Sequence, residues 1–443
     1  SGRPKPARWA TAGPIPTGML NRPTSPGLQK PPPENPPKRK KRRRRSFPWL
    51  GIFAVVLTGA LLFAIGRYRR DLNNPPVAAE SVPASITAQD GDTLTIAAAG
   101  DINITEEILR SAQQSDGAYD FSEMLLGMVP SLSGADLTVA DLEVNCLGAP
   151  YDPAQYNAPE GLLSALAESG VDLVQTANTV SIYNGMSGLH STLTAVRNAG
   201  LIPVGTFATE QEAKEAKGFT LVEVKGFRVA FVAFTKGVGN LRLPDGAEYS
   251  MNLLYHDYNT TYQDVNTDGI REVLSQVQSE KPDITIALLH WGSEYNSTVS
   301  ESQEEIRDLM LEGGVDVILG THSHLVGPLE MTDSPDGRML TAYSLGNLLS
   351  TSEESGANQG IVLQLQFTKT ADGVTLTDYS YDPLYLAGEG ETASGKIEIW
   401  NTADQVALYE SSYVGRVSDE IYESLKGSLE EVEASVQARD DAE

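Results

Sequence analysis

Cysteine is nearly absent from this sequence, since Cys146 is the single cysteine among 443 residues. An intrachain disulfide is therefore excluded, and the folded part must be stable through its buried core. A chain of this length can bury enough apolar surface to do so. We expect Cys146 itself to serve as a small buried apolar side chain rather than as a reactive thiol.

Basic residues are scarce after residue 70. Residues 1–70 hold 16 of the 33 lysines and arginines and one acid, Glu34, which leaves 17 basic and 58 acidic residues in the remainder. The two regions therefore suit different environments. A polyanion would be repelled by so acidic a surface unless bound cations offset the charge. If the main part handles an anionic polymer, a divalent metal must supply the positive field.

Long apolar runs are also scarce, and the one exception lies near the start of the chain. Residues 47–66 carry no charge, and about 20 residues at roughly 1.5 Å each span a hydrocarbon core of about 30 Å. Lysine and arginine fill residues 38–45 before the run, and Arg67, Arg69 and Arg70 follow it. The denser positive side stays in the cytoplasm. The sequence therefore predicts a single-pass cell-membrane protein with a transmembrane helix at 47–68, a cytoplasmic N-terminus and an extracellular main domain.

A cleaved signal peptide and a buried core helix are the alternatives for this run. The long preceding segment and the Arg67-Tyr-Arg-Arg70 that follows argue against a signal peptide, and the unbroken apolar run argues against a core helix. The basic octet would also suit nucleic acid, but beside a membrane span it fits anionic lipid better. We therefore expect membrane lipid as a partner and no nucleic acid. An exported domain without disulfides fits a bacterial surface.

Composition predicts the remaining boundaries. Residues 1–46, rich in Pro, Gly and charge, predict a disordered basic cytoplasmic arm, and residues 69–92 predict a linker. Strand-like and helical stretches alternate over 93–400, which predicts an α/β domain with a largely parallel sheet. Residues 401–443 predict an acidic helical C-terminal extension. The expected strands are 94–99, 135–143, 171–176, 201–204, 219–224, 228–234, 284–290, 315–321, 339–343 and 361–368, and the expected helices are 105–114, 161–169, 188–199, 270–279 and 302–312.

Histidine is scarce as well, and three of the five histidines follow apolar strand-like runs. His290 ends one run, and His322 and His324 follow the next. Asp101 also follows an apolar run, and Glu143 ends another. In sheets covered by helices, ligands collect beyond the carboxyl ends of the strands. The sequence therefore predicts a metal site assembled from several loops.

Six short segments in order resemble one known family. They are Gly100-Asp101, Asp141-Leu-Glu143, Ala177-Asn178, His290-Trp-Gly-Ser-Glu294, Gly320-Thr-His322-Ser-His324 and Tyr343-Ser-Leu-Gly-Asn347. Over about residues 95–350 the chain resembles the CapA family of capsule and poly-γ-glutamate biosynthesis proteins, a branch of the calcineurin-like metallophosphatase superfamily. The resemblance implies a four-layer α/β/β/α sandwich with a two-metal site at one edge of its sheets.

The resemblance also implies roles for single residues. Asp101 and Glu143 would be carboxylate ligands, with Glu143 as the bridge, and the imidazole ligands would be His290, His322 and His324. Chemistry adds to the resemblance, because Glu294 and Asn347 carry oxygens that could orient these ligands. Carboxylate oxygens with neutral imidazoles suit Mn, Zn or Fe, bound as one or two divalent ions.

The loop near residue 178 departs from the family pattern. The family has Ala-Asn-Asn-His and then Asp-Tyr-Gly, whereas this chain has Ala177-Asn178-Thr179-Val180 and then Tyr183. An expected ligand is thus Thr179, and the histidine expected to protonate the leaving group or stabilise charge is Val180. Valine can neither coordinate nor transfer a proton, and loss of a general acid costs about 10²–10⁴-fold in rate. Asn178 and His290 remain the candidate catalytic residues, and Asn178 or Asn184 could replace the missing ligand if the loop shifts.

The sequence also allows other roles for the histidines and for the residues near them. The three histidines could be hydrogen-bonded without a metal, and Asp101 could be a turn residue. His190 and His256 fit surface positions best, although His256 could instead supply the missing acid. Trp291 and Tyr295 could line a substrate groove or pack against the sheet.

Two functions from different classes fit these observations. The first is a membrane-anchored extracellular enzyme, metal-dependent and hydrolase-like, that acts in capsule or poly-γ-glutamate synthesis or export. The second is a non-catalytic scaffold of a polymer-synthesis complex, suggested by Thr179 and Val180. The expected partners are an anionic polymer or the membrane subunits of a polymer synthase. A surface phosphoesterase for small phosphorylated substrates is a weaker third possibility.

Overall fold

The chain divides into two units, Ser1–Val82 and Pro83–Glu443. The computed structural model describes residues 87–334, 337–411 and 417–437, all of them in the second unit. The predicted arm 1–46, the transmembrane helix 47–68 and most of the linker 69–92 lie outside the described residues. Across the residues that are described, no helix combines the length and the apolar character needed to cross a membrane.

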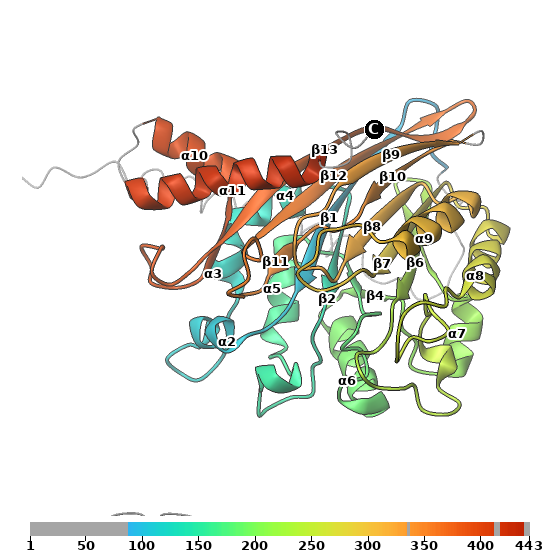
Figure 1. Cartoon of the computed structure of the whole chain (residues 1–443), viewed down its shortest axis with the longest axis horizontal. Coiled ribbons are helices and arrows are strands. Elements are labelled where there is room, and N and C mark those ends of the chain that lie inside the picture. The colour runs from blue at the N-terminus through green and yellow to red at the C-terminus, as the bar shows by residue number, and fades with distance from the viewer. Residues whose placement is uncertain (1–86, 335–336, 412–416, 438–443) are drawn as a thin grey trace, which may run out of the picture. The chain divides into compact units, whose positions relative to one another are not determined.

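Two mixed β-sheets form the centre of the second unit (Figure 1). The eight-stranded sheet runs in the order β14 (Glu398–Asn401), β13 (Gly373–Ala387), β12 (Gln359–Thr370), β1 (Thr93–Ile102), β2 (Leu137–Leu142), β3 (Leu173–Gln175) and β4 (Ile202–Val204), with β11 (Asn347–Leu349) paired to β1. The six-stranded sheet runs in the order β5 (Thr220–Val224), β6 (Phe227–Thr235), β7 (Ile284–His290), β8 (Val317–Thr321), β10 (Gly337–Ala342) and β9 (Leu329–Ser334).

Helices and short 3₁₀ turns follow the strands. They are α2 (Glu106–Ala112), α3 (Ser122–Leu125), η1 (Leu126–Met128), α4 (Val129–Ser133), η2 (Pro153–Gln155), α5 (Gly161–Ser169), α6 (Gly185–Asn198), α7 (Glu210–Ala216), η3 (Glu248–Ser250), α8 (Thr267–Ser279), α9 (Glu301–Glu312), α10 (Thr402–Glu410) and α11 (Asp419–Gln437). The mixed α/β class predicted from the sequence is confirmed.

The alternation of side chains along the strands explains why the sheets stack. In β1, Leu94 and Ile96 belong to a core shared by both sheets, whereas Ala97 packs with helices on the opposite face. In β6, Phe231 likewise points into the shared core and Val232 points away. Because successive strand residues face opposite sides, one buried strand contributes to two cores. Helices α2–α5 cover the outer face of the eight-stranded sheet, and α8 and α9 cover that of the six-stranded sheet (Figure 1).

An aspartate precedes four of the parallel strands and fastens each of them to its neighbour. Each aspartate accepts a hydrogen bond from a backbone N–H of the adjacent strand and donates its own N–H to the carbonyl of that same residue. The carboxylate pairs are Asp136 with Thr95 (2.9 Å), Asp172 with Thr138 (3.0 Å), Asp283 with Arg228 (2.9 Å) and Asp316 with Thr285 (2.8 Å). These contacts fix the register at the amino ends of the strands. The carboxyl ends of the same strands are therefore aligned as well. The predicted metal site lies at these carboxyl ends.

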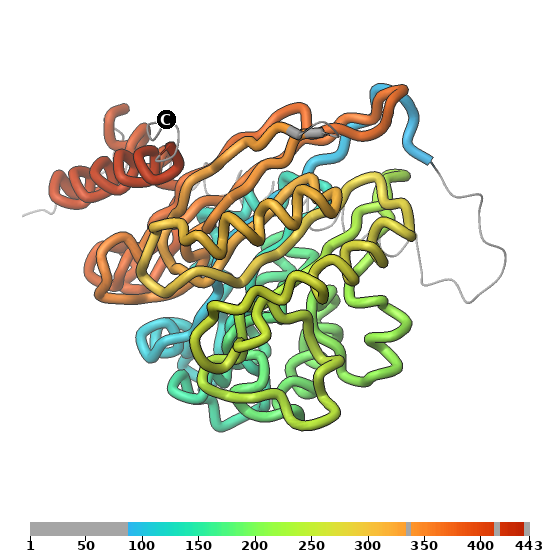
Figure 2. Tube along the Cα trace, turned by 45° about the vertical axis from the view of Figure 1, so that its right-hand side comes forward, coloured from blue at the N-terminus to red at the C-terminus, as the bar shows by residue number. Residues whose placement is uncertain are grey.

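The C-terminal helices pack onto the eight-stranded sheet. Helix α11 lies along β12 and β13, as the two views in Figures 1 and 2 show. Val432 and Val436 join the core between the sheets, and Gln359 donates a hydrogen bond of 2.7 Å to Glu431. The predicted helical character of residues 401–443 is thus present in α10 and α11, and α11 contributes to the fold of the main domain.

Candidate metal centre

The five residues predicted as ligands come together at the carboxyl ends of four parallel strands. They extend from β1, β2, β7 and β8, and they come from both sheets. All are buried, with exposed fractions of 0% for Asp101, 2% for Glu143, 0% for His290, 4% for His322 and 6% for His324. Asp101 lies within β1 and pairs with Asp141 and Asn347 on either side. The alternative that Asp101 is a turn residue is therefore wrong.

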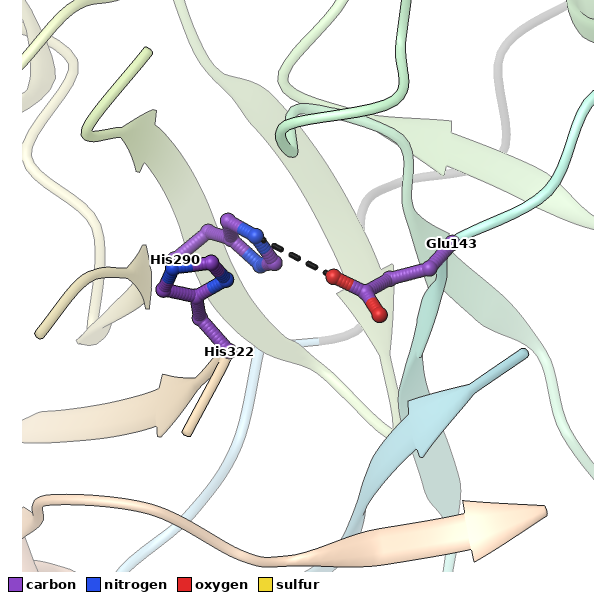
Figure 3. Close-up of side chains that lie close together, drawn as sticks. All are labelled: Glu143, His290 and His322. Atoms are coloured by element: carbon purple, nitrogen blue, oxygen red, sulfur yellow. Dashed lines mark ion pairs between the residues drawn. The ribbon is translucent and has the colours of Figure 1, made fainter. Parts of the chain in front are cut away.

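Glu143 lies between two sets of imidazoles. Its Oε1 atom is 3.1 Å from Nε2 of His290, and its Oε2 atom is 3.6 Å from Nε2 of His324. Figure 3 shows the carboxylate directed at His290, with the His322 ring beside it. Each carboxylate oxygen thus faces a different histidine. This arrangement is compatible with the bridging role that the family resemblance implies for Glu143.

Asp141 orients His290 from the other side of the ring. Its Oδ2 atom lies 2.8 Å from Nδ1 of His290 and accepts a hydrogen bond of 2.7 Å from the hydroxyl of Thr321. The side-chain amide of Asn178 donates to Oδ1 of Asp141 at 3.0 Å. With Nδ1 held in this way, Nε2 of His290 is directed at Glu143. A carboxylate behind an imidazole fixes the ring and raises its basicity as a ligand.

His322 and His324 are held by the backbone of their loop. Both have positive φ angles, 91° and 59°, a conformation that costs energy for residues other than glycine and is found at functional sites. The backbone N–H of His322 donates to both oxygens of Asp101 at 3.2 Å. Nδ1 of His324 lies 2.9 Å from Oδ1 of Asn347. Asn347 therefore orients His324, as predicted from the sequence.

The electrostatics of the cluster are unbalanced without a cation. Burial raises the pKa values of Asp101 and Glu143, and their carboxylate neighbours raise them further. Burial also lowers the pKa of His322, and the neighbouring His290 lowers it further. Neutral imidazoles cannot compensate three crowded carboxyl groups in a buried site, because isolated buried charge is costly.

A divalent metal fits this donor set. Ligand atoms of Glu143, His290 and His322 lie within 4.8 Å of one another, as do those of Asp101, Asp141, Glu143 and His290. In addition, Nδ1 of His322 is buried and has no hydrogen-bond partner among the residues that the structure describes. An unsatisfied buried polar atom costs about 1–3 kcal/mol, and coordination would satisfy it. The buried His, Asp and Glu cluster is thus compatible with divalent metal binding.

The loop at residues 177–180, which departs from the family pattern, presents a hydroxyl group where the family has an amide. Oγ1 of Thr179 lies 3.4 Å from Nε2 of His290, so Thr179 faces the centre, whereas Val180 is a buried apolar residue. Asn184 donates to Asn145 and to the carbonyl of Gln155. The structure therefore gives no support to Asn184 as a replacement ligand.

Asn178, a candidate catalytic residue, is fully engaged in hydrogen bonds. Its amide nitrogen donates to Asp141 and to the carbonyl of Leu142, and its oxygen accepts from the N–H of Val180. These contacts make it a support for Asp141, and a direct role in catalysis stays a prediction. His190 and His256 are exposed, as expected for surface histidines.

The aromatic and acidic residues near the candidate metal centre are either buried supports of the sheet or exposed residues at the border of the centre. Trp291 is buried and stacks on Tyr343 with ring centroids 5.6 Å apart, so it supports the sheet. Tyr295 is 42% exposed, and its ring centroid lies 5.5 Å from that of His324, so it borders the centre. Glu294 is also exposed and acts on Glu143 through its charge.

Sequence reasoning missed two residues, Thr321 and Lys236. Thr321 precedes His322 and donates a hydrogen bond to Asp141. Lys236 follows Thr235, the last residue of β6, which pairs with His290. Both stand at the carboxyl end of a parallel strand. That position is the signal that could have identified them.

Comparison with known proteins agrees with the family resemblance. Residues 95–352 match the family model described as bacterial capsule synthesis protein PGA_cap. The capsule biosynthesis protein CapA of Bacillus anthracis is 24% identical over 277 residues, which cover 60% of this chain and 62% of that protein. The PGA biosynthesis protein CapA of Bacillus subtilis (strain 168) is 21% identical over 291 residues, covering 64% of this chain and 70% of that protein.

Solved structures are more distant. Calcineurin-like phosphoesterase YfkN from Bacillus subtilis is 12% identical, covers 76% of this chain and 100% of that chain, and has a TM-score of 0.40. A hypothetical protein from Thermus thermophilus is 16% identical, covers 66% of this chain and 98% of that chain, and also has a TM-score of 0.40. Likeness at this level carries no argument about activity.

Proposed function

This chain belongs to the bacterial capsule synthesis protein family PGA_cap, and from that premise we propose that it is a membrane-anchored, extracellular, metal-dependent hydrolase-like protein. Its substrate is an anionic capsule polymer, such as poly-γ-glutamate, during synthesis or export. The observation that carries the proposal is Glu143, whose two oxygens face His290 and His324, next to the unpartnered Nδ1 of His322.

Mn, Zn or Fe, as one or two ions, is the proposed cofactor, because these metals accept mixed carboxylate and imidazole ligands. The ligands are Asp101, Glu143, His290, His322 and His324. A bound divalent ion would lower the pKa of a water molecule and polarise the group under attack. The chain's own residues keep the ligands in place: Asp141 holds Nδ1 of His290, and Asn347 holds Nδ1 of His324.

The charge of the chain makes the metal necessary for an anionic substrate. The region after residue 70 has 58 acids against 17 bases, and such a surface repels polyanions. The proposed metal supplies positive charge at the point where a polymer would be processed. Anchoring through residues 47–68, contact with membrane lipid and contact with polymer-synthase subunits are parts of the same proposal. Anchoring and lipid contact are supported by the uncharged run and its basic flanks.

A non-catalytic scaffold is the second candidate. Val180 favours it, because this residue cannot protonate a leaving group, and Thr179 replaces an expected ligand. In this alternative the centre stabilises the fold, and the polymer is made or processed by membrane partners.

Restoring the family residues separates the two candidates. The wild-type full chain and a Thr179→Asn, Val180→His variant would be assayed on poly-γ-glutamate and an aryl phosphate, with and without a chelator. The hydrolase proposal expects weak wild-type turnover that the chelator abolishes, and a rise of about 10²-fold or more in the restored variant. An Asp101→Ala, His322→Ala variant should be inactive, and the matched control His256→Ala should match the wild type. Turnover in the restored variant alone would favour the scaffold.

A further inference from the structure

Lys236 places a positive charge beside the metal centre. It follows Thr235, the last residue of β6, which pairs with His290 in β7. Its backbone N–H donates to the carbonyl of His290 at 2.8 Å, and its Nζ donates to the carbonyl of Gly292. Both partners belong to the strand end and loop that present His290. The position of Lys236 is therefore coupled to that of the ligand.

Lys236 is not neutralised by an ion pair in the described part of the chain. Its Nζ lies 4.5 Å from the ring centroid of Tyr262. Lys225 is different, because its Nζ lies 2.9 Å from Oδ2 of Asp136 at the opposite ends of the strands. A carbonyl and an aromatic face hold an ammonium group without neutralising it. Lys236 thus keeps its positive charge for a further anion.

Tyr262 is held in place at an energetic cost. Its φ angle is 53°, in the left-handed region that favours glycine or asparagine. The ring is supported by Tyr255, with centroids 5.9 Å apart, and the hydroxyl donates to the carbonyl of Gly239 at 3.5 Å. The strained backbone carries a side chain that contacts Lys236. Strain of this kind is concentrated at functional sites.

The surroundings of Lys236 combine burial with one nearby acid. Burial lowers the pKa of its ammonium group, and the charge of Glu294, in the loop after β7, raises that pKa. The lysine is half-buried, so water screens its field less than that of a surface lysine.

We propose that Lys236 is the anion-binding residue of this centre, and that it holds a phosphoryl or carboxylate oxygen of the substrate beside the metal ligands. This inference rests on the proposed function. Lys236 supplies positive charge that the chain lacks at position 180, where the family pattern has histidine and this chain has Val180.

The test measures anion binding rather than turnover. The full chain would be loaded with Mn²⁺ and titrated calorimetrically with inorganic phosphate in one arm and glutarate in the other, so that the two arms distinguish phosphoryl from carboxylate substrates. Lys236→Gln should weaken binding of the preferred anion by about tenfold or more, because a charge-assisted hydrogen bond is lost. Lys236→Arg should stay within about threefold, and the matched control Lys225→Gln should equal the wild type. Lys236→Met keeps the aliphatic stem over the Tyr262 ring and serves if the glutamine variant folds poorly.

Manganese content, measured by elemental analysis on each sample, separates this inference from the proposed function. Equal anion affinity in the wild type and in Lys236→Gln, at equal manganese content, would overturn the role of Lys236 alone. So would the absence of binding of either anion to the manganese-loaded wild type. A wild-type chain that takes up none of manganese, zinc and iron would contradict the proposed function and this inference together.

Discussion

The two ends of the parallel strands use acidic residues in opposite ways. At the amino ends, Asp136, Asp172, Asp283 and Asp316 each accept a backbone N–H from the neighbouring strand. At the carboxyl ends, Asp101, Asp141 and Glu143 lie close enough for ligand atoms of all three to fall within 4.8 Å of one another and of His290. The first set is satisfied by the fold itself. The second set gathers carboxyl groups beside imidazoles in a buried cluster that is compatible with divalent metal binding.

This difference shows why acids that look alike in the sequence have different consequences. An aspartate ahead of an apolar run meets free N–H groups at the start of the adjacent strand and fixes the register. An acid behind such a run is brought to an edge where several strands converge, and there it meets other acids. Removing the side-chain acceptor should therefore weaken the fold at the amino ends, and removing a carboxyl charge should relieve repulsion at the carboxyl ends when no metal is bound.

The largest expected effect comes from removing the metal. At a metal concentration about 1,000 times its Kd, chelation should lower the free energy of unfolding by about 4 kcal/mol. The loss should be greater at about pH 8 than at about pH 5.5. Asp101 and Glu143 have raised pKa values when folded without a cation, so their contribution to stability is present at low pH and is lost as pH rises. Thermal unfolding with and without chelator at both pH values checks this, and equal shifts at the two pH values would contradict it.

The next effect concerns a single ligand. His290→Ala should weaken metal affinity by about 100-fold or more, since loss of a residue that merely orients a ligand already costs about 10–100-fold. Competition against a calibrated chelator measures the change. His256→Ala removes an exposed histidine and should leave the affinity unchanged, and a similar loss in both variants would show that the centre was wrongly located.

Asp316, at the amino end of β8, should change the free energy of unfolding by about 2 kcal/mol in a pH-dependent way. Burial raises the pKa of Asp316 to about 6, above the value for an unfolded chain. The stability that this group contributes is therefore present below about pH 4 and is lost as pH rises through about 6. Asp316→Asn keeps an oxygen for the N–H of Thr285 and avoids the buried charge. The variant should be more stable than the wild type by up to about 2 kcal/mol at pH 8 and should lose this advantage near pH 4, as urea unfolding would show.

The smallest expected effect compares one acid from each end. Asp172→Ala removes the acceptor for the N–H of Thr138 and should destabilise the protein by about 1–2 kcal/mol. Glu143→Gln in chelated protein should leave the melting temperature unchanged or raise it, because a repelling buried carboxyl group becomes neutral. A loss of stability in both variants would contradict the claim that acids at the amino and carboxyl ends of the strands have opposite effects on stability.

Much of the fold could be predicted because the central strands are buried on both faces. The runs at 284–290 and 94–99 correspond to β7 and the core of β1, and the helix at 161–169 matches α5. Strand β13 was missed because much of its first part is exposed, so its sequence lacks an apolar run. The four aspartates at the amino ends were not recognised as a repeated device, since their partners lie on other strands.

The residues of the candidate site could be predicted from the sequence, but the side-chain contacts that link them could not. His290, His322 and Asp101 could be inferred because each follows a strand-like run. The links from Thr321 to Asp141 and from Lys236 to Tyr262 join segments distant in sequence. Tyr262 and His322 also adopt left-handed backbone conformations without the glycine or asparagine that usually indicates them. Such positions depend on tertiary contacts.

Elemental analysis of the full chain, purified without chelator, tests the central claim most directly. We expect at least one divalent metal ion per chain in the wild type and in Asp172→Asn, and a loss of about tenfold or more in Glu143→Ala. A folded wild-type chain that contains no metal and gains no thermal stability from added Mn²⁺, Zn²⁺ or Fe²⁺ would contradict the claim that the acids at the carboxyl ends of the strands require a cation.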